Sequence, residues 1–204
     1  MAKKKNPANV SVGKPKAGGA VFLAPAGTPV PTDAKSELPE EFACLGCINE
    51  DGVVNTQSTE SEEFSDWEGD VVETTTSKFS ETYKMTFIEA INVDVLKFVY
   101  GDANVDVTAG GGIHVRHNGS ERDEAVMVVD TILKGRRVDR LVVPRAKVSE
   151  IGDITRKKSE LIGYEATVKA LSDDGGDCTH EYIDELPEPG AAEQPSVPEQ
   201  GGDK

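Results

Sequence analysis

The chain has 204 residues, of which 37% are apolar and 29% charged, and its net charge is −15. This composition supports one folded domain with a core of its own, and no apolar run approaches the ~18 residues that a membrane-spanning helix needs. The acidic balance argues against ordinary DNA binding, which uses a basic surface, and three cysteines argue against a disulfide framework.

The two ends of the chain are expected to be flexible and opposite in charge. Residues 1–18 carry five lysines and no acid, and we interpret them as a basic arm. No apolar stretch follows to complete a signal peptide, so we expect the protein to be made and kept in the cytosol. Residues 184–204 carry six acids and one lysine and are rich in Pro, Glu and Gly, which predicts a disordered tail. The folded domain is therefore predicted over residues 19–183.

A C-x-x-C pair, Cys44 and Cys47, is the first candidate for metal binding. It lies in the segment 42–48, which we interpret as a strand, where residues three apart face opposite sides. A zinc site needs two further ligands, for which only Cys178 and His180 are available. We therefore predict no metal site and no cofactor.

The most unusual stretch is acidic. Nine carboxylates and no Lys, Arg or His lie between Glu50 and Glu73, and crowded like charges repel one another. We interpret residues 57–70 as a polar acidic loop that is either solvated or paired with a basic partner. The glycine of the Asp-Trp-Glu-Gly-Asp run at 66–70 is misplaced for an EF-hand, so no calcium site is predicted there.

Strand patterns dominate the rest of the chain. Apolar and polar residues alternate in 79–87 and 162–171, which is typical of strands with one buried face. The run 125–133 is apolar on both faces, as in a strand covered on both sides. The β-branched run 138–144 ends at a proline and predicts another strand.

One helix is expected at 92–101, with Asn92 as its N-cap and Gly101 as its C-terminal stop. A single helix among many strands predicts a mainly β fold, an antiparallel β-sandwich or barrel-like domain with one packed α-helix. The sequence contains no G-x-S-x-G motif and no P-loop. His114 and His117 are interpreted as exposed strand residues, so no enzyme is predicted.

Five blocks of the sequence resemble one known family. The third block is the most specific, because it joins an acidic stretch containing Trp-Glu-Gly to two strands and a helix ending in Val-Tyr-Gly-Asp. The blocks are 17-AGGAVFLAPAGTPVPTDA-34, 45-LGCINEDGV-53, 60-ESEEFSDWEGDVVETTTSKFSETYKMTFIEAINVDVLKFVYGDANV-105, 133-LKGRRVDRLVVPRAKVSEIGDI-154 and 162-IGYEATVKAL-171. They are similar to the major tail proteins, or tail tube proteins, of long-tailed non-contractile bacteriophages.

This resemblance implies a structural virion protein. Proteins of this kind form six-fold rings that stack into a hollow tube, and the viral genome passes through the tube into the host. The inner sheets of neighbouring subunits join into one barrel, and a long loop between the early strands reaches the next ring. The implied partners are further copies of the chain, the tape measure, tail terminator and distal tail proteins, and viral DNA passing non-specifically through the lumen. Synthesis in the host bacterial cytoplasm and a final location in the virion follow.

Two segments are candidate contact sites in such an assembly. The acidic loop is a candidate for ring stacking, with two aromatic anchors among its acids. Its members are Glu60, Glu62, Glu63, Phe64, Asp66, Trp67, Glu68 and Asp70. The segment 134–147 has six bases against one acid and is the candidate basic partner on an adjoining subunit. Its bases are Lys134, Arg136, Arg137, Arg140, Arg145 and Lys147. Two alternatives stay open: a carbohydrate- or cell-surface-binding β-sandwich module, and an enzyme with an acidic active-site loop.

Overall fold

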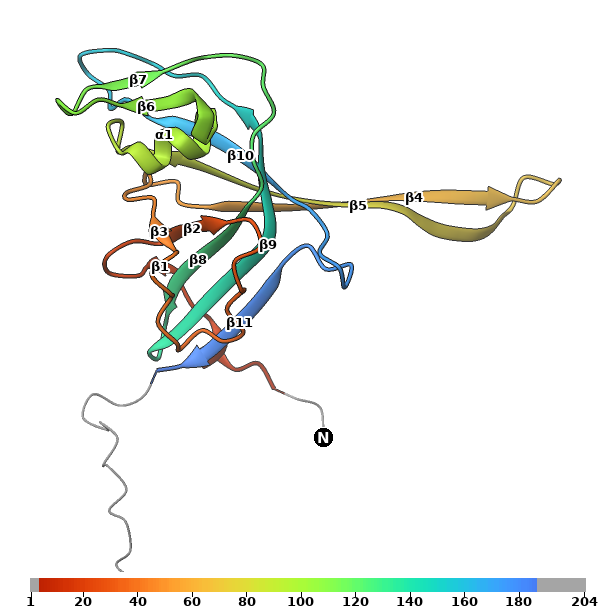
Figure 1. Ribbon diagram of the computed structural model, residues 1–204. Helices are drawn as coiled ribbons and strands as arrows, with labels where there is room; N and C mark the ends of the chain where they lie inside the picture. The colour runs from red at the N-terminus through yellow and green to blue at the C-terminus, as the bar shows by residue number, and fades with distance from the viewer. Residues whose placement is uncertain (1–3, 187–204) are drawn as a thin grey trace, which may run out of the picture.

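Antiparallel strand pairing organises residues 4–186, which are the residues described by the computed structural model (Figure 1). One sheet of nine strands has the order β3-β2-β8-β9-β10-β5-β4, with β1 added to β8 and β11 added to β9. A separate pair, β6-β7, lies beside the α-helix α1, Val93–Tyr100. The strands are β1 Lys14–Pro15, β2 Val21–Pro25, β3 Ala43–Cys44, β4 Val54–Ser65, β5 Val71–Phe87, β6 Val105–Val107, β7 Ile113–Val115, β8 Ala125–Leu133, β9 Arg137–Ile151, β10 Tyr164–Ala170 and β11 His180–Glu185. The mainly β, antiparallel, sandwich-like fold predicted from the sequence is confirmed.

The strand β8 is buried on both of its faces, as its apolar run predicts. Met127 and Val129 face the larger core, whereas Val126 and Val128 face a smaller cluster on the opposite side. The connection from β2 to β3 covers that second side with apolar residues such as Phe42. Because both faces of β8 lose contact with water, polar side chains on it need partners within the protein.

The helix α1, Val93–Tyr100, packs against the larger core and matches the predicted boundaries. Asn92 Oδ1 accepts a hydrogen bond from the backbone N–H of Asp94 at 3.0 Å, and Gly101 ends the helix with a φ of 94°. The apolar side of the helix is buried, as its i, i+3, i+4 spacing predicts. Two short 3-10 helices, Pro7–Asn9 and Asp102–Asn104, complete the described helical segments.

The predicted end of a strand at Pro144 is wrong, because β9 continues through this residue to Ile151. A register shift in the pairing with β8 falls opposite Pro144: Met127 pairs with Val143, and Ala125 pairs with Ala146. A bulge tolerates proline because no ladder hydrogen bond is required from its nitrogen. The added length lets one edge of β9 pair first with β11 and then with β10.

Both predicted terminal boundaries need correction. Lys14 and Pro15 pair with β8, so the second half of the predicted arm lies on the folded domain. At the other end β11 runs to Glu185, and Asp184 accepts a hydrogen bond from the backbone N–H of Ala34 at 3.0 Å. The rest of the predicted tail, residues 187–204, lies outside the described residues. Strands β1 and β11 lie at the same end of the molecule (Figure 1).

Candidate functional site

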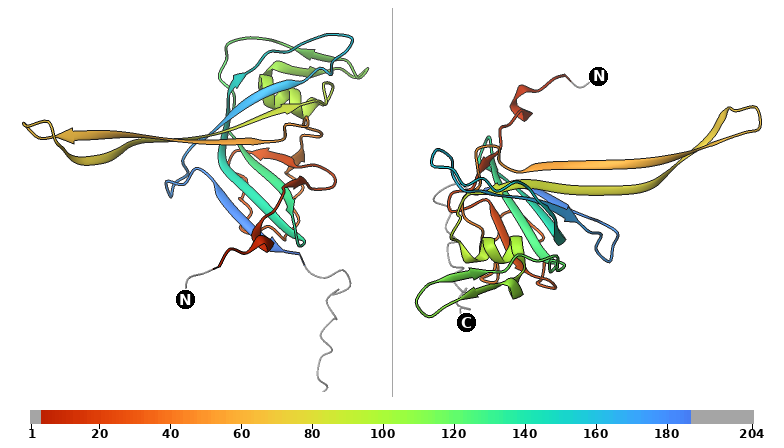
Figure 2. Two further views of the ribbon diagram at one scale, coloured as in Figure 1. Left: turned by 180° about the vertical axis from the view of Figure 1, so that it is seen from behind. Right: turned by 90° about the horizontal axis from the view of Figure 1, so that it is seen from above.

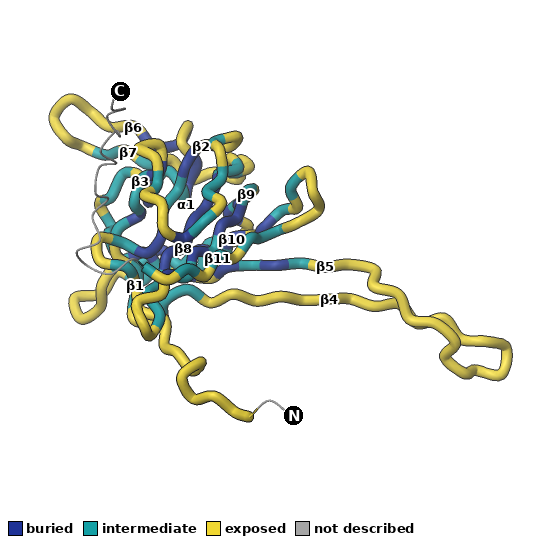
Figure 3. The backbone as a smooth tube through the Cα atoms, turned by 90° about the horizontal axis from the view of Figure 1, so that it is seen from below, coloured by how far each residue is buried: buried dark blue, intermediate teal, exposed yellow. Residues whose placement is uncertain are grey.

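An exposed β-hairpin projects from the domain. It is formed by β4 and the first half of β5, which extend together away from the rest of the sheet (Figure 2). Every residue from Val54 to Phe79 is exposed (Figure 3). The predicted acidic loop at 57–70 is therefore mostly strand, and only residues 66–70 form the turn. Since β10 pairs with β5 only from Glu81 onward, both edges of the hairpin beyond that point lack a strand partner among residues 4–186.

Polar cross-strand pairs hold the hairpin together. Threonine and serine are frequent in both strands, and β-branched residues such as threonine suit the extended backbone. Glu60 faces Lys78 across the strands, and their side chains form an ion pair at 2.8 Å. Register shifts follow Glu60 and Phe64; such bulges bend a strand and increase its twist.

The turn at the tip is closed by the side chain of Asp66. Its Oδ1 atom accepts hydrogen bonds from the backbone N–H groups of Glu68 and Asp70, each at 3.0 Å. Gly69 adopts a φ of 94°, which an L-residue rarely takes. The carboxylates of Asp66, Glu68 and Asp70 consequently lie within 4.8 Å of one another, and the turn accounts for this spacing without a metal.

Apolar side chains gather at the same tip. Trp67 has a relative exposure of 102%, and Phe64, Val71 and Val72 are each at least half exposed. None of these four side chains belongs to either hydrophobic cluster of residues 4–186. Exposed aromatic groups of this kind are the usual anchors of protein–protein contacts, and the role of Phe64 and Trp67 as contact residues stays a prediction.

A buried carboxylate fastens the foot of the hairpin. Glu81 Oε1 accepts hydrogen bonds from Asn55 at 2.8 Å, Gln57 at 3.1 Å and the Tyr83 hydroxyl at 3.0 Å. That hydroxyl also lies 3.0 Å from Thr179 Oγ1. Burial raises the pKa of Glu81, but these hydrogen-bonding side chains together outweigh it and leave the pKa below its usual value. Burial raises the pKa of Tyr83 well above its ordinary range.

The sequence patterns above do not single out Glu81, although its position in β5 marks it as unusual. Residues 79, 81, 83, 85 and 87 share one face of β5, and Glu81 is the charged exception on that face. A carboxylate in such a position needs hydrogen-bond partners once it is buried. The partners come from β4 and from the segment before β11, which the sequence pattern does not place beside β5.

The basic segment 134–147 is less available than predicted. Arg140 is fully buried, and its guanidinium forms a two-point ion pair with Asp130 at 2.7 and 2.8 Å. It also donates to the backbone carbonyls of Asp33 and Ser36. Arg140 therefore does not belong to an exposed basic patch, because its guanidinium is buried and paired with Asp130 where β8 pairs with β9.

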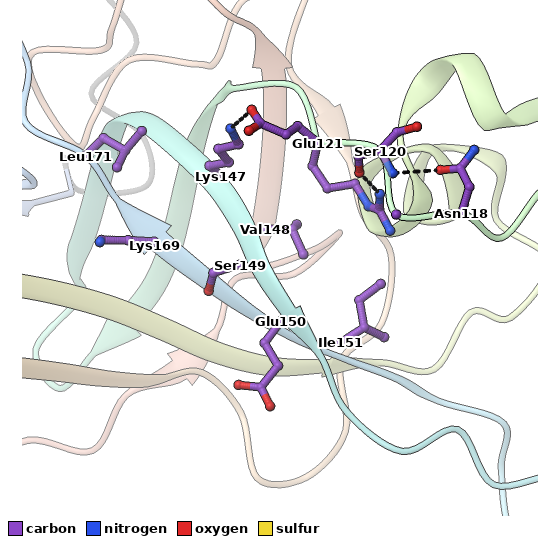
Figure 4. A pocket seen from close by; sticks show the side chains of 12 residues that line it. Asn118, Ser120, Glu121, Lys147, Val148, Ser149, Glu150, Ile151, Lys169 and Leu171 are labelled. Atoms are coloured by element: carbon purple, nitrogen blue, oxygen red, sulfur yellow. Dashed lines mark hydrogen bonds and ion pairs between the residues drawn. The ribbon is translucent and has the colours of Figure 1, made fainter.

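Two more bases of this segment have partners within the subunit. Arg145 binds Glu124 at 2.9 and 3.1 Å, and Lys147 binds Glu121 at 2.9 Å. Lys147 lies on the wall of a groove of about 470 Å³ between the 118–122 loop and the last part of β9 (Figure 4). Lys134 and Arg136 in the β8–β9 turn and Arg137 at the start of β9 are also exposed.

The family follows from a match along nearly the whole chain. Residues 6–193 match the family described as phage tail tube protein. The chain belongs to this family. Among curated proteins, none matches it significantly.

As a phage tail tube protein, the chain is a structural component of the virion rather than a member of an enzyme family. It assembles with itself and with other tail proteins. No helix among residues 4–186 is long and apolar enough to span a membrane. For a tail tube protein, the exposed hairpin and the basic turn are surfaces that assembly can use, whereas Arg140 belongs to the subunit's interior.

Proposed function

We propose that this protein forms hexameric rings that stack into the hollow tube of a long, non-contractile tail, through which viral DNA passes during ejection into the host. The single observation that carries this proposal is the hairpin of residues 54–79, which is exposed along its whole length. From Gln57, which pairs with Glu81, to Trp67 the chain advances ten residues, or ~33 Å at ~3.3 Å per residue. An element of this length reaches a neighbouring subunit.

Open strand edges support the ring. The strands β4, β5, β10 and the end of β9 form a four-stranded antiparallel unit. Its two outer edges are β4 and the stretch of β9 beyond Ala146, which β8 does not reach. When copies of such a unit join edge to edge, β9 of one copy meets β4 of the next in antiparallel orientation. Repetition around an axis closes a barrel, which leaves no unpaired edge.

The hairpin serves, in this proposal, as the contact to the next ring. Stacked rings make head-to-tail contacts, in which two unlike surfaces of one chain meet. Phe64 and Trp67 supply apolar anchors, and the surrounding acids require bases on the adjoining subunit. Of the predicted basic segment, Lys134, Arg136 and Arg137 are exposed and are the candidates for this role. Arg140, Arg145 and Lys147 form ion pairs within their own subunit.

Partners other than the chain itself follow from the same proposal. The tape measure, tail terminator and distal tail proteins would meet the lumen and the two ends of the tube. DNA would pass without sequence-specific contacts. The competing hypothesis of a carbohydrate-binding module requires exposed aromatic residues around a pocket, whereas Trp67 and Phe64 lie on a protruding tip.

Electron microscopy of concentrated purified protein tests the proposal. The intact chain is expected to give tubes of uniform diameter with six-fold rings. The matched variant replaces residues 58–80 with an Asn-Gly turn and retains Glu81 and Gln57 at the foot. It is expected to retain cooperative thermal unfolding and to form rings that do not stack. A compact dimer as the final assembly state of the intact chain would contradict the proposal.

A further inference from the structure

The N-terminal arm lies beside the β8–β9 turn. The backbone N–H of Lys134 donates a hydrogen bond to Ser11 Oγ at 2.7 Å. Lys14 and Pro15 then pair with β8, and Lys16 Nζ lies 3.3 Å from the buried carboxylate of Asp130. Two basic segments that are more than a hundred residues apart in sequence therefore form one surface at this end of the molecule.

This surface is basic in an acidic protein. Residues 4–18 contain four lysines and no acid, and the turn adds three further bases. Its side chains are exposed or half-buried, and they are Lys4, Lys5, Lys14, Lys16, Lys134, Arg136 and Arg137. We call this set the basic end.

Within residues 4–186, five acids lie near the seven bases of the basic end. Asp130 is held by Arg140 and Lys16, and Asp184 forms an ion pair with Lys35 at 3.5 Å. Glu185 lies opposite Arg137 in the pairing of β11 with β9. Glu181 and Asp139 also belong to this part of the sheet, and burial raises the pKa of each. Lys4, Lys5, Lys14 and Lys134 have no ion pair within residues 4–186.

The hairpin carries the complementary charge. Seven carboxylates lie between Glu60 and Glu73, whereas Lys78 is the single base from Val54 to Phe79. Within the described part of the chain, Glu60 is the only one of these seven in an ion pair. The other six are exposed and concentrated toward the tip, beside Trp67.

A second exposed cluster of bases, Arg156, Lys157 and Lys158, fits the hairpin less well. Lys157 forms an ion pair with Glu160 at 3.1 Å, and Asp153 lies in the same loop. Two acids thus stand among three bases. The basic end has more bases, and its arm contributes no acid at all.

We propose that the basic end of one copy, with the N-terminal arm as its larger part, is the surface that receives the acidic hairpin tip of a second copy. This inference rests on the proposed function, because it names the partner surface of the hairpin between rings. Complementary charge of this kind steers association and fixes register more than it adds affinity. The arm thereby becomes an assembly element rather than a solvated extension.

Zero-length cross-linking tests the contact directly. Tubes assembled from equal amounts of ¹⁵N-labelled and unlabelled protein are treated with a carbodiimide, which joins a carboxylate to an amine it touches. We expect mixed-isotope links between peptides containing Glu62–Glu73 and Lys4, Lys5, Lys14 or Lys134. Either of two results would overturn the inference. In the first, the hairpin gives mixed links only to lysines elsewhere in the chain. In the second, the arm lysines are joined only to acids of their own chain, including those of the 187–204 segment.

Charge reversal supplies the second test. Lys4→Glu, Lys5→Glu and Lys134→Glu together should reduce the pelleted tube fraction at least tenfold, and Glu62→Lys with Glu63→Lys in the same chain should restore it in part. The matched control, Lys157→Glu with Lys158→Glu, should leave tube formation unchanged. If the control abolishes tubes and the first variant does not, this inference alone fails. Protein that forms no rings or tubes at all overturns the proposed function as well.

Discussion

At the foot of the hairpin, Glu81 works as a charged hydrogen-bond acceptor. The carboxylate joins Asn55 and Gln57 of β4 to Tyr83 of β5, so it sets the point at which the hairpin leaves the sheet. Its folded-state pKa lies below the ordinary value of a glutamate. The resulting stabilisation is present above the unfolded-state pKa of ~4.3 and is lost as the pH falls through the folded-state pKa.

Glu81→Gln is expected to lower the free energy of unfolding by about 1–3 kcal/mol at pH 7, because hydrogen bonds to a charged acceptor are lost. The difference from the unmodified protein should shrink as the pH falls below about 4. Urea unfolding followed by circular dichroism at several pH values measures both effects. Glu62→Gln, an exposed control, should change little; a pH-independent loss for Glu81→Gln would contradict the explanation.

Arg140 and Arg137 offer a matched pair of arginines on one strand. Arg140→Met leaves Asp130 buried with only Lys16 beside it, and breaking a buried ion pair costs about 3–5 kcal/mol. Arg137→Met changes an exposed side chain and should stay within about 0.5 kcal/mol. Chemical denaturation of both variants checks the contrast. Equal losses would show that the Asp130 pair contributes no special stability.

At the scale of elements, the tip of the hairpin is expected to contribute to assembly and not to the stability of the folded subunit. Trp67→Ala should leave the melting temperature unchanged, because the side chain is fully exposed in the subunit. Stacking should weaken by ~2 kcal/mol, the value typical of a buried aromatic anchor at an interface. Pelleting of tubes at graded protein concentrations measures this, and Trp67→Phe should retain most of the stacking. An unfolded Trp67→Ala subunit would show that the residue stabilises the subunit itself.

The sequence predicts some elements well because their local residue patterns match the burial that they have in the folded domain. The helix at 92–101 has a capping asparagine and a terminating glycine, and the strand at 125–133 has apolar residues on both faces. The hairpin was missed as strand because exposed Thr, Ser and Glu show no apolar alternation. The burial of Arg140 depends on its register with Asp130, which becomes visible only when β8 is paired with β9.

At the scale of the whole molecule, net charge opposes association. A charge of −15 makes subunits repel one another at long range, while opposite charges on the hairpin and the basic end attract only at short range. Salt at physiological strength limits electrostatic interaction to ~8 Å. Added salt therefore weakens the long-range repulsion between subunits before it weakens the short-range attraction between the hairpin and the basic end.

The protein is accordingly expected to stay monomeric at low ionic strength and to assemble with a shorter lag as salt approaches about 0.15 M. Sedimentation velocity across a salt series, combined with light scattering, checks this. Adding preformed tube fragments should shorten the lag at every salt concentration, since a fragment supplies the nucleus. A compact dimer that persists unchanged across the series would contradict the expectation.

The bare edges of the hairpin also bear on how the free subunit survives in solution. Two long strands with unsatisfied backbone groups on both sides are a template for indiscriminate β-pairing and aggregation. Carboxylates at close intervals act as gatekeepers against such pairing, because two hairpins that approach edge to edge bring like charges together. The acids that select a basic partner are thus the same groups that protect an exposed strand pair before it finds one.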